Sequence, residues 1–226
     1  MISHQCERKE LSLNTLRQQI NRIRLQLGRK NNVVGWAMTP DETRAFFDSQ
    51  GKTVLTFFGY MAGYENEKEM FAIVRKVLSG YSPATTLVND GVTKWGLGEI
   101  YPLAKSLGFT TAGIVSNQIL NDPTDISPSV DHICFIDDSQ WGGKLPDSNE
   151  LSPTSKAMLD CSDVLVAIGG GEISRDELVA GKEQGKPIQY YPAEVNHEWV
   201  FHHAKRKGLP PPESFWGSVH ELFGDK

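Results

Sequence analysis

Cysteines are scarce in this chain of 226 residues, and they form no pattern that would use them. The three, Cys6, Cys134 and Cys161, are an odd number without a CxxC pair. This excludes a disulfide framework and a zinc site built on paired cysteines. Cys134 lies in the apolar run 132–136, so we expect a buried core thiol there rather than a nucleophile.

Long apolar runs and an excess of positive charge are also absent. No stretch approaches the roughly 18 apolar residues of a membrane span, and the N-terminal residues lack the apolar core of a secretory signal. The net charge of −5 is unfavourable for binding nucleic acid phosphates, although basic residues are frequent between positions 17 and 30. We therefore expect a cytoplasmic protein that binds neither membranes nor nucleic acid.

Recognisable catalytic and metal-binding patterns are missing as well. His197, His202 and His203 stand without an HExxH motif or a carboxylate at ligand spacing, so no metal site is predicted. No Ser/His/Asp order or activated cysteine stands out. The P-loop motif GxxxxGK[ST] and the dinucleotide motif GxGxxG are absent, and no cofactor is predicted.

What the chain does have is an alternation of strand and helix patterns. Short apolar strands are expected at 53–58, 85–88, 110–115, 132–136, 164–168 and 187–191. Helical patterns occupy the intervals at 67–79, 97–107, 152–160 and 175–184. Strands that are apolar along their whole length are typical of a parallel sheet buried on both faces. The predicted fold class is therefore α/β, a Rossmann-like parallel sheet with helices on both faces.

The N-terminal part has a different pattern. Residues 11–27 carry leucines and isoleucines three and four apart, which predicts an amphipathic helix that packs on the domain or on a second subunit. Pro40 begins a further helix, with Thr39 as its candidate cap. We expect three parts: an N-terminal helical extension (1–51), a Rossmann-like nucleotide-binding domain (52–205) and an irregular C-terminal tail (206–226).

Three glycine-rich segments follow predicted strands, at 58–63, 90–99 and 169–177. In parallel α/β sheets, ligands bind beyond the carboxyl ends of the strands, near a switch in strand order. The candidate ligand-binding residues therefore end these strands or begin the next helices: Gly59, Tyr60, Asn89, Asp90, Gly91, Thr93, Lys94, Gly96, Gly98, Glu99, Gly169, Gly170, Gly171, Glu172 and Ser174.

The chemistry expected at these segments is anion binding. Backbone N–H groups at a helix start, together with the helix dipole, attract a phosphate, and Thr93 and Lys94 can add a hydroxyl and a charge. At Gly59, approach of a nucleotide and an ordinary strand–helix turn are equally good explanations. Ser174 and Glu177 have the spacing of a capping box, with Ser174 as N-cap, which explains both without a ligand. The preceding glycines then still need a reason, such as a phosphate or a ribose.

Together the segments resemble the LOG-like Rossmann proteins, which include the lonely-guy phosphoribohydrolases and proteins once misnamed lysine decarboxylases. The resemblance runs from about Val54 to Tyr191. The family segments "vfGSs", "yGGg..GLMG.va", "GG.viGViP" and "sDa.valPGGxGTxxE" correspond to residues 57–60, 88–100, 108–116 and 162–177.

This resemblance implies a nucleotide or nucleotide-derived ligand and a homo-oligomer, commonly a dimer. In the family's enzymes, the last glutamate of PGGxGTxxE and an upstream arginine cleave the N-glycosidic bond of a nucleoside 5′-monophosphate. The products are the free base and ribose 5-phosphate. Glu177 matches that glutamate, so the resemblance makes it the possible catalytic residue, and Ser174 stands in for the threonine.

Several positions depart from the family pattern. Gly169 replaces the proline, Ile173 the middle glycine and Asp90 the second glycine of the "GGg" turn, while Ser155 stands at the position of the catalytic arginine. Three functions stay open: a nucleotide-binding sensor without turnover, which the missing arginine favours, a phosphoribohydrolase, and a domain without a ligand. The loop around Trp141 is either a lid over the site or a plain surface loop.

Overall fold

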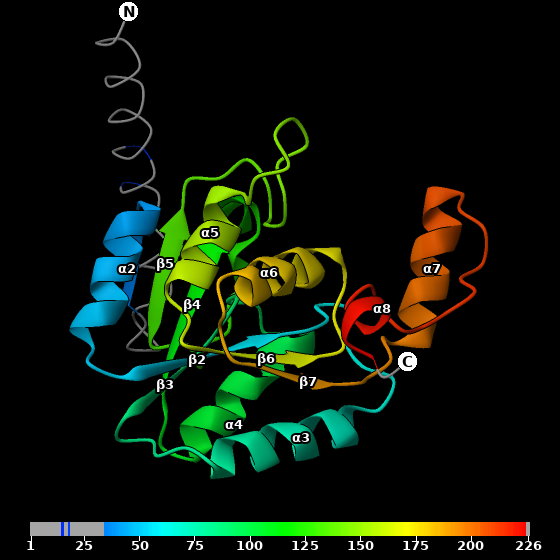
Figure 1. Ribbon diagram of the computed structural model, residues 1–226. Coiled ribbons are helices and arrows are strands. Elements are labelled where there is room, and N and C mark those ends of the chain that lie inside the picture. Colours follow the sequence, from blue (N-terminus) through cyan, green and yellow to red (C-terminus); the bar gives the residue numbers. More distant parts are fainter. Residues whose placement is uncertain (1–14, 16–17, 19–33, 225–226) are drawn as a thin grey trace, which may run out of the picture.

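The strands form one parallel sheet in the order β1-β5-β4-β3-β2-β6-β7 (Figure 1). The computed structural model describes residues 15, 18 and 34–224. The strands are β1 (Val34–Met38), β2 (Thr53–Phe58), β3 (Thr86–Asp90), β4 (Thr110–Ser116), β5 (His132–Ile136), β6 (Val164–Ile168) and β7 (Ile188–Tyr191). The helices are α2 (Pro40–Ser49), α3 (Glu67–Ser79), α4 (Ile100–Ser106), α5 (Pro153–Asp160), α6 (Glu172–Glu183), α7 (His197–Lys207) and α8 (His220–Phe223). Short 3₁₀ helices are η1 (Gly96–Glu99), η2 (Asn117–Asn121) and η3 (Pro123–Asp125). The predicted α/β fold is confirmed.

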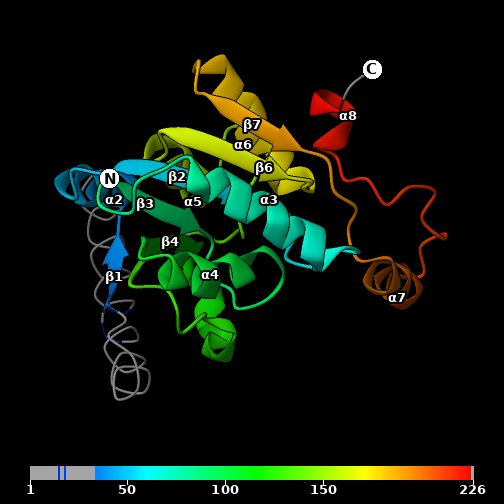
Figure 2. The ribbon, with the colours of Figure 1, turned by 90° about the horizontal axis from the view of Figure 1, so that it is seen from below.

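Helices cover both faces of the sheet. Figure 1 shows α2, α5 and α6 on one face, and Figure 2 shows α3 and α4 on the other. The alternation of side chains along β2 supplies both layers: Val54 and Phe58 join the core beneath α5 and α6, whereas Leu55 and Phe57 join the core beneath α3 and α4. Because the strands are buried on both faces, their sequences are apolar, and these apolar runs allowed the sheet to be predicted.

The strand order reverses at β2. From β2 the chain continues to β3 and then outward through β4 to β5, whereas β6 pairs with the opposite edge of β2. Crossovers therefore leave β2 in two directions, which opens a crevice beyond the carboxyl ends of β2, β3 and β6. This is where the glycine-rich segments meet.

The predicted elements agree closely with those observed in the central region. The strands at 53–58, 132–136 and 164–168 and the helix at 67–79 have the predicted bounds. Thr39 caps α2 as expected, and Glu42 completes a capping box with it. The helix predicted at 97–107 is instead the 3₁₀ helix η1 followed by α4. Within the described residues, no helix is both long and apolar enough to cross a bilayer.

The predicted limits of the domain differ from the structure at both ends. β1 was not predicted, yet it pairs with β5 over its whole length, and α2 packs against α5. Residues 34–49 are therefore part of the sheet layer and not of a separate extension. The helix predicted at 11–27 lies outside the described residues, apart from positions 15 and 18.

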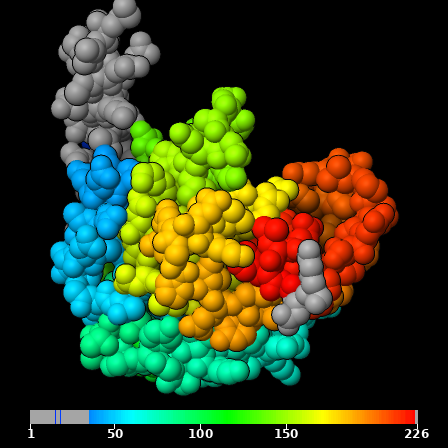
Figure 3. All heavy atoms as spheres, viewed as in Figure 1, coloured from blue at the N-terminus to red at the C-terminus, as the bar shows by residue number. Residues whose placement is uncertain are grey.

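The C-terminal tail is folded onto the domain rather than irregular. α7 extends to Lys207, α8 forms near the end, and Val219 is fully buried in the core that contains Leu178 of α6. In Figure 3 the red C-terminal residues lie beside the yellow and orange α6. The prolines at 210–212 favour an extended segment between α7 and α8, and this made the whole tail look irregular in the sequence.

Candidate functional site

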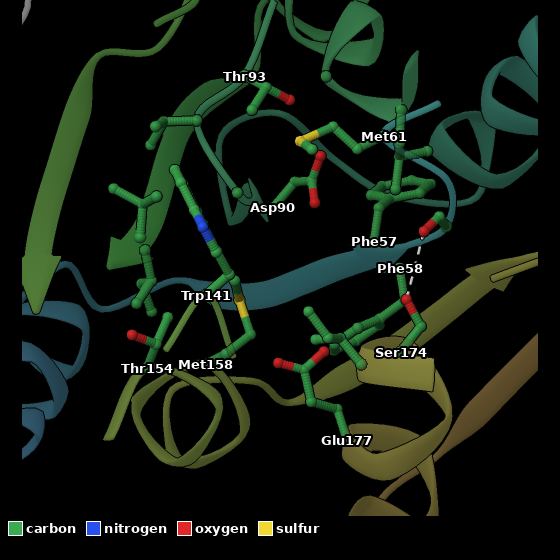
Figure 4. Close-up of a pocket in the computed structure, with 18 residues that line it drawn as sticks. Phe57, Phe58, Met61, Asp90, Thr93, Trp141, Thr154, Met158, Ser174 and Glu177 are labelled. Atoms are coloured by element: carbon green, nitrogen blue, oxygen red, sulfur yellow. Dashed lines mark hydrogen bonds between the residues drawn. The ribbon is translucent and has the colours of Figure 1, made fainter. Parts of the chain in front are cut away.

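A cavity of about 220 Å³ lies in the crevice beyond the ends of β2, β3 and β6 (Figure 4). It is bounded by the segments after these strands, by the end of β4, by α5 and α6, and by the loop that contains Trp141. Its lining residues are Phe57, Phe58, Gly59, Met61, Asp90, Gly91, Val92, Thr93, Leu97, Gly98, Ile114, Val115, Trp141, Thr154, Met158, Ile173, Ser174 and Glu177.

Asp90 is the last residue of β3 and places a carboxyl group in this cavity. Burial raises its pKa to about 7, against an opposing effect from a hydrogen bond with the Gly91 backbone. A Cβ atom added to Gly91 would meet nothing within 4 Å, so the backbone is open to a ligand there. The end of β3 thus combines an acidic group with an accessible turn.

Glu177 lies in the second turn of α6 and is 5% exposed. Its Oε1 accepts a hydrogen bond of 2.6 Å from Ser155 Oγ, which in turn accepts one of 2.7 Å from the Gly143 N–H. Burial raises the pKa of Glu177 to about 8; the Ser155 hydrogen bond opposes this rise, and the charge of Asp90 adds to it. At neutral pH the Glu177 carboxyl is therefore mostly protonated.

The capping box predicted for Ser174 and Glu177 does not form. α6 begins at Glu172, three residues earlier than predicted, so Ser174 lies inside its first turn and Gly171 is the N-cap. Ser174 Oγ donates instead to the Gly59 carbonyl at 3.3 Å. Because Gly171 has no side chain, no side-chain cap satisfies the first N–H groups of α6. Ile173 and Ser174 of this turn line the cavity.

Two of the three glycines after β6 have a packing reason that needs no ligand. Gly169 and Gly170 have φ angles of +57° and +130°, which L side chains rarely adopt. A Cβ at Gly169 would lie 2.3 Å from the Tyr60 ring, and one at Gly170 would lie 2.8 Å from Val219. At Gly171 an added Cβ would meet nothing within 4 Å. Of the triplet, Gly171 alone is left open to a ligand.

Packing also explains Gly59, Gly96 and Gly98. An added Cβ would lie 2.0 Å from Tyr64 Oη at Gly59, 2.3 Å from the Tyr60 carbonyl at Gly96 and 1.8 Å from the Thr93 carbonyl at Gly98. These glycines bring the turns after β2 and β3 together. Gly59 and Gly98 thereby shape the cavity wall whether or not a ligand is bound.

The structure gathers about half of the sequence-predicted site residues around the cavity. Those in its lining are Gly59, Asp90, Gly91, Thr93, Gly98, Ser174 and Glu177. Those outside the lining are Tyr60, Asn89, Lys94, Gly96, Glu99, Gly169, Gly170, Gly171 and Glu172. Gly171 and Glu172 adjoin the lining through the first turn of α6.

Three of the residues outside the lining have other partners. Lys94 donates to the Thr124 carbonyl at 2.6 Å, so its charge is held away from the cavity. Tyr60 Oη bonds the Ala193 carbonyl and the Gly217 N–H, and thereby holds the C-terminal segment. Asn89 is fully buried and donates to Thr56 of the neighbouring strand.

Sequence reasoning named the loop around Trp141 as a lid or a surface loop, but it missed Asp138, which follows β5, and Thr154 at the start of α5. The buried carboxylate of Asp138 accepts hydrogen bonds from the Gln140 and Thr154 backbone N–H groups. It thereby ties the loop after β5 to α5, and it brings Thr154 and Trp141 to the cavity. The Asp137–Asp138 pair directly after a buried strand is the signal that could have pointed to this edge. Trp141 lines the cavity and is half exposed.

The cavity holds carboxyl groups but no cation. Asp90 and Glu177 are its ionisable lining residues, and no Lys, Arg or His is found in the lining formed by the described residues. Across the described part of the chain, no group of three or more His, Cys, Asp or Glu is arranged to hold a metal ion. Among the described residues, the charges that line the cavity are therefore only acidic, and backbone N–H groups, chiefly those of the α6 start, are the groups that could face an anion.

No family model and no curated protein matches this sequence. Among solved structures, the molybdenum cofactor carrier protein of Chlamydomonas reinhardtii is similar with a TM-score of 0.43 and 23% identity, over 62% of this chain and 76% of that one. A hexameric APS kinase from Thiobacillus denitrificans is similar with a TM-score of 0.30 and 15% identity, over 83% of this chain and 40% of that one. The α/β fold class is shown by the chain's own sheet topology.

Proposed function

We propose that this chain binds a nucleotide or a nucleotide-derived ligand in the cavity, and that it does so without turnover. The main support for the proposal is the location of the cavity. It lies at the switch in strand order, between the open turn at Gly91 and the start of α6, which no side chain caps. Ligands of parallel α/β sheets bind at such points. The resemblance to LOG-like proteins supports the same class of ligand.

The phosphate end of the ligand fits best at the start of α6. Backbone N–H groups without intrahelical partners and the positive end of the helix dipole attract an anion. Gly171 leaves this point free of side chains. A cavity of about 220 Å³ lies below the range of roughly 300–1,000 Å³ for drug-sized ligands. A mononucleotide that is partly outside the cavity fits this space, and a dinucleotide does not.

The base end fits the apolar part of the cavity. Phe57, Met61, Met158 and Ile173 contribute apolar surface, and Trp141 stands at the rim with half of its surface exposed. A flat ring that stacks on an exposed indole buries apolar area from both partners. The loop around Trp141 therefore acts in this proposal as a wall of the site, held by the hydrogen bond from Gly143 to Ser155.

Absence of turnover is inferred from the partner of Glu177. Cleavage of an N-glycosidic bond develops positive charge on the sugar and requires assistance to the leaving base. At the position where the resembled enzymes have arginine, this chain has Ser155, whose hydroxyl is already engaged with Glu177 and Gly143. No cation from the described residues lines the cavity to replace that arginine. This arrangement supports binding more than hydrolysis.

A phosphoribohydrolase is the second candidate, and one observation favours it. Asp90 and Glu177 share the cavity, and their pKa values are raised to about 7 and about 8. Two carboxyls that titrate near neutrality can act as a general acid and a general base. In this alternative, protonated Glu177 assists the leaving base and ionised Asp90 activates water.

A panel of nucleoside 5′-monophosphates separates the two functions. Each is added to the purified protein, the melting temperature is recorded, and the solution is assayed for free base by chromatography. We expect a rise in melting temperature without release of base. Release that is lost in Glu177→Gln would establish the hydrolase instead. Neither a shift nor release with any member of the panel would refute both functions.

A variant of the α6 start tests where the phosphate binds. Gly171→Leu places a side chain in open space next to the first N–H groups of α6, so it should fold and lose the nucleotide-dependent shift. Gly80→Leu is the matched control, because Gly80 is an exposed C-cap with ordinary backbone angles on α3, away from the cavity. Full binding by Gly171→Leu would place the phosphate elsewhere.

A further inference from the structure

The two carboxyl groups of the cavity face a space to which the described residues contribute no positive charge. Figure 4 shows the Asp90 and Glu177 side chains on opposite sides of the cavity, with Trp141 on a third side. Asp90 stands where the resembled family has a glycine. The carboxyl group on this side of the cavity is therefore a feature that the family pattern does not include. The carboxyls are close enough for the charge of Asp90 to raise the pKa of Glu177. An electronegative group of a ligand between them would add to this repulsion.

The carboxyls retain capacity to accept hydrogen bonds. Glu177 receives the Ser155 hydroxyl on Oε1, and a carboxylate has about four acceptor positions on its two oxygens. Exocyclic amino groups of a heterocycle donate two hydrogen bonds, whereas the corresponding oxo groups donate none. Between two carboxylates, an amino group therefore gains charge-assisted hydrogen bonds and an oxo group meets repulsion.

We infer that the site selects an amino-substituted nucleobase, whose exocyclic amino group lies between Asp90 and Glu177. This inference rests on the proposed function, since it assigns the base end of the same ligand. The phosphate then lies toward the start of α6. Asp90 and Glu177 are thereby the residues that determine base specificity.

Matched pairs of nucleotides test the inference directly. AMP and purine riboside 5′-monophosphate, and CMP and pyrimidin-2-one riboside 5′-monophosphate, share ribose, phosphate and ring nitrogens and differ only in the exocyclic amino group. Dissociation constants are measured by calorimetry at a pH above the pKa values of both carboxyls. We expect the amino member of a pair to bind about tenfold more tightly or better, the size expected for a charge-assisted hydrogen bond.

Variants assign the preference to the named residues. Asp90→Asn and Glu177→Gln should each reduce the preference to less than about threefold, because a neutral amide accepts more weakly than a carboxylate. Glu183→Gln makes the same change at an exposed position near the end of α6 and should keep the full preference.

The outcomes separate this inference from the function on which it rests. Equal binding of the two members of each pair would overturn the selection of amino bases and leave nucleotide binding intact. A preference that survives in folded Asp90→Asn and Glu177→Gln would likewise overturn it. Absence of binding by every nucleotide would overturn the proposed function and the inference together. The wild-type comparison needs no variant, so failure of one variant to fold does not prevent the test.

Discussion

The substitution Glu177→Gln should change how the stability of the protein depends on pH. Glutamine keeps the shape of the side chain and its oxygen can still accept the Ser155 hydroxyl, but it removes the buried group that titrates. The pKa of Glu177 is raised from its ordinary value of 4.5 to about 8, mainly by burial. The folded state therefore holds this proton more tightly than the unfolded state does.

The sign of the effect follows from linkage. Wherever the folded state binds more protons than the unfolded state, the free energy of unfolding falls as pH rises. The stabilisation from protonated Glu177 is thus complete below the unfolded pKa and is lost as pH rises through about 8. One pKa unit corresponds to about 1.4 kcal/mol, so the free energy of unfolding falls by at most roughly 5 kcal/mol over this pH range.

Urea denaturation at about pH 5 and about pH 9 measures this loss. Relative to wild type, Glu177→Gln should be equal or less stable at the lower pH and more stable at the higher pH. Glu172→Gln is the matched control, because it makes the same change at an exposed position of the same helix. If the stability difference between Glu177→Gln and wild type stays within about 0.5 kcal/mol from the lower to the higher pH, the reasoning from burial is refuted.

Four further substitutions have definite expected outcomes. Ser155→Ala leaves the Gly143 N–H and Glu177 without their shared partner, so urea unfolding should show a loss of about 1–3 kcal/mol, and the pKa of Glu177 should rise further. Gly170→Ala combines a positive φ with a contact at 2.8 Å and should cost about 1–3 kcal/mol, whereas Gly171→Ala should stay within about 0.5 kcal/mol in the same assay. Tyr60→Phe removes two hydrogen bonds to the C-terminal side of the chain, and limited proteolysis should cleave that side faster; an unchanged rate would contradict this role.

The parallel sheet could be predicted because its strands are apolar on both faces. Such runs need only local composition to be recognised, and the bounds at β2, β5 and β6 were correct. β1 was missed because its five residues, VGWAM, include a glycine and stand at the edge of the sheet. Its place is decided by pairing with β5, a contact between residues about 100 positions apart. Pairing over such a separation leaves no local pattern.

The position of the candidate site could be predicted, but the reasons for its glycines could not. Strand ends in a parallel sheet converge on one edge, so Asp90 and Glu177 were expected near each other. The sequence could not show that Tyr60 and Val219 approach Gly169 and Gly170, because Val219 comes from a distant tail. A glycine required by close packing and one required by a ligand look alike in the sequence.

The pairing of Ser155 with Glu177 decides how the site is interpreted. The capping-box spacing predicted that the Glu177 side chain caps the start of its own helix. In the structure this side chain points toward α5, where the Ser155 hydroxyl donates a hydrogen bond to it. A hydroxyl is neutral, so it positions the carboxyl without balancing a negative charge there. Burial then keeps Glu177 protonated near neutral pH. An arginine at position 155 would favour the ionised form, and so would a ligand that donates hydrogen bonds. In this chain burial therefore keeps Glu177 neutral near neutral pH, unless a ligand that donates hydrogen bonds occupies the cavity.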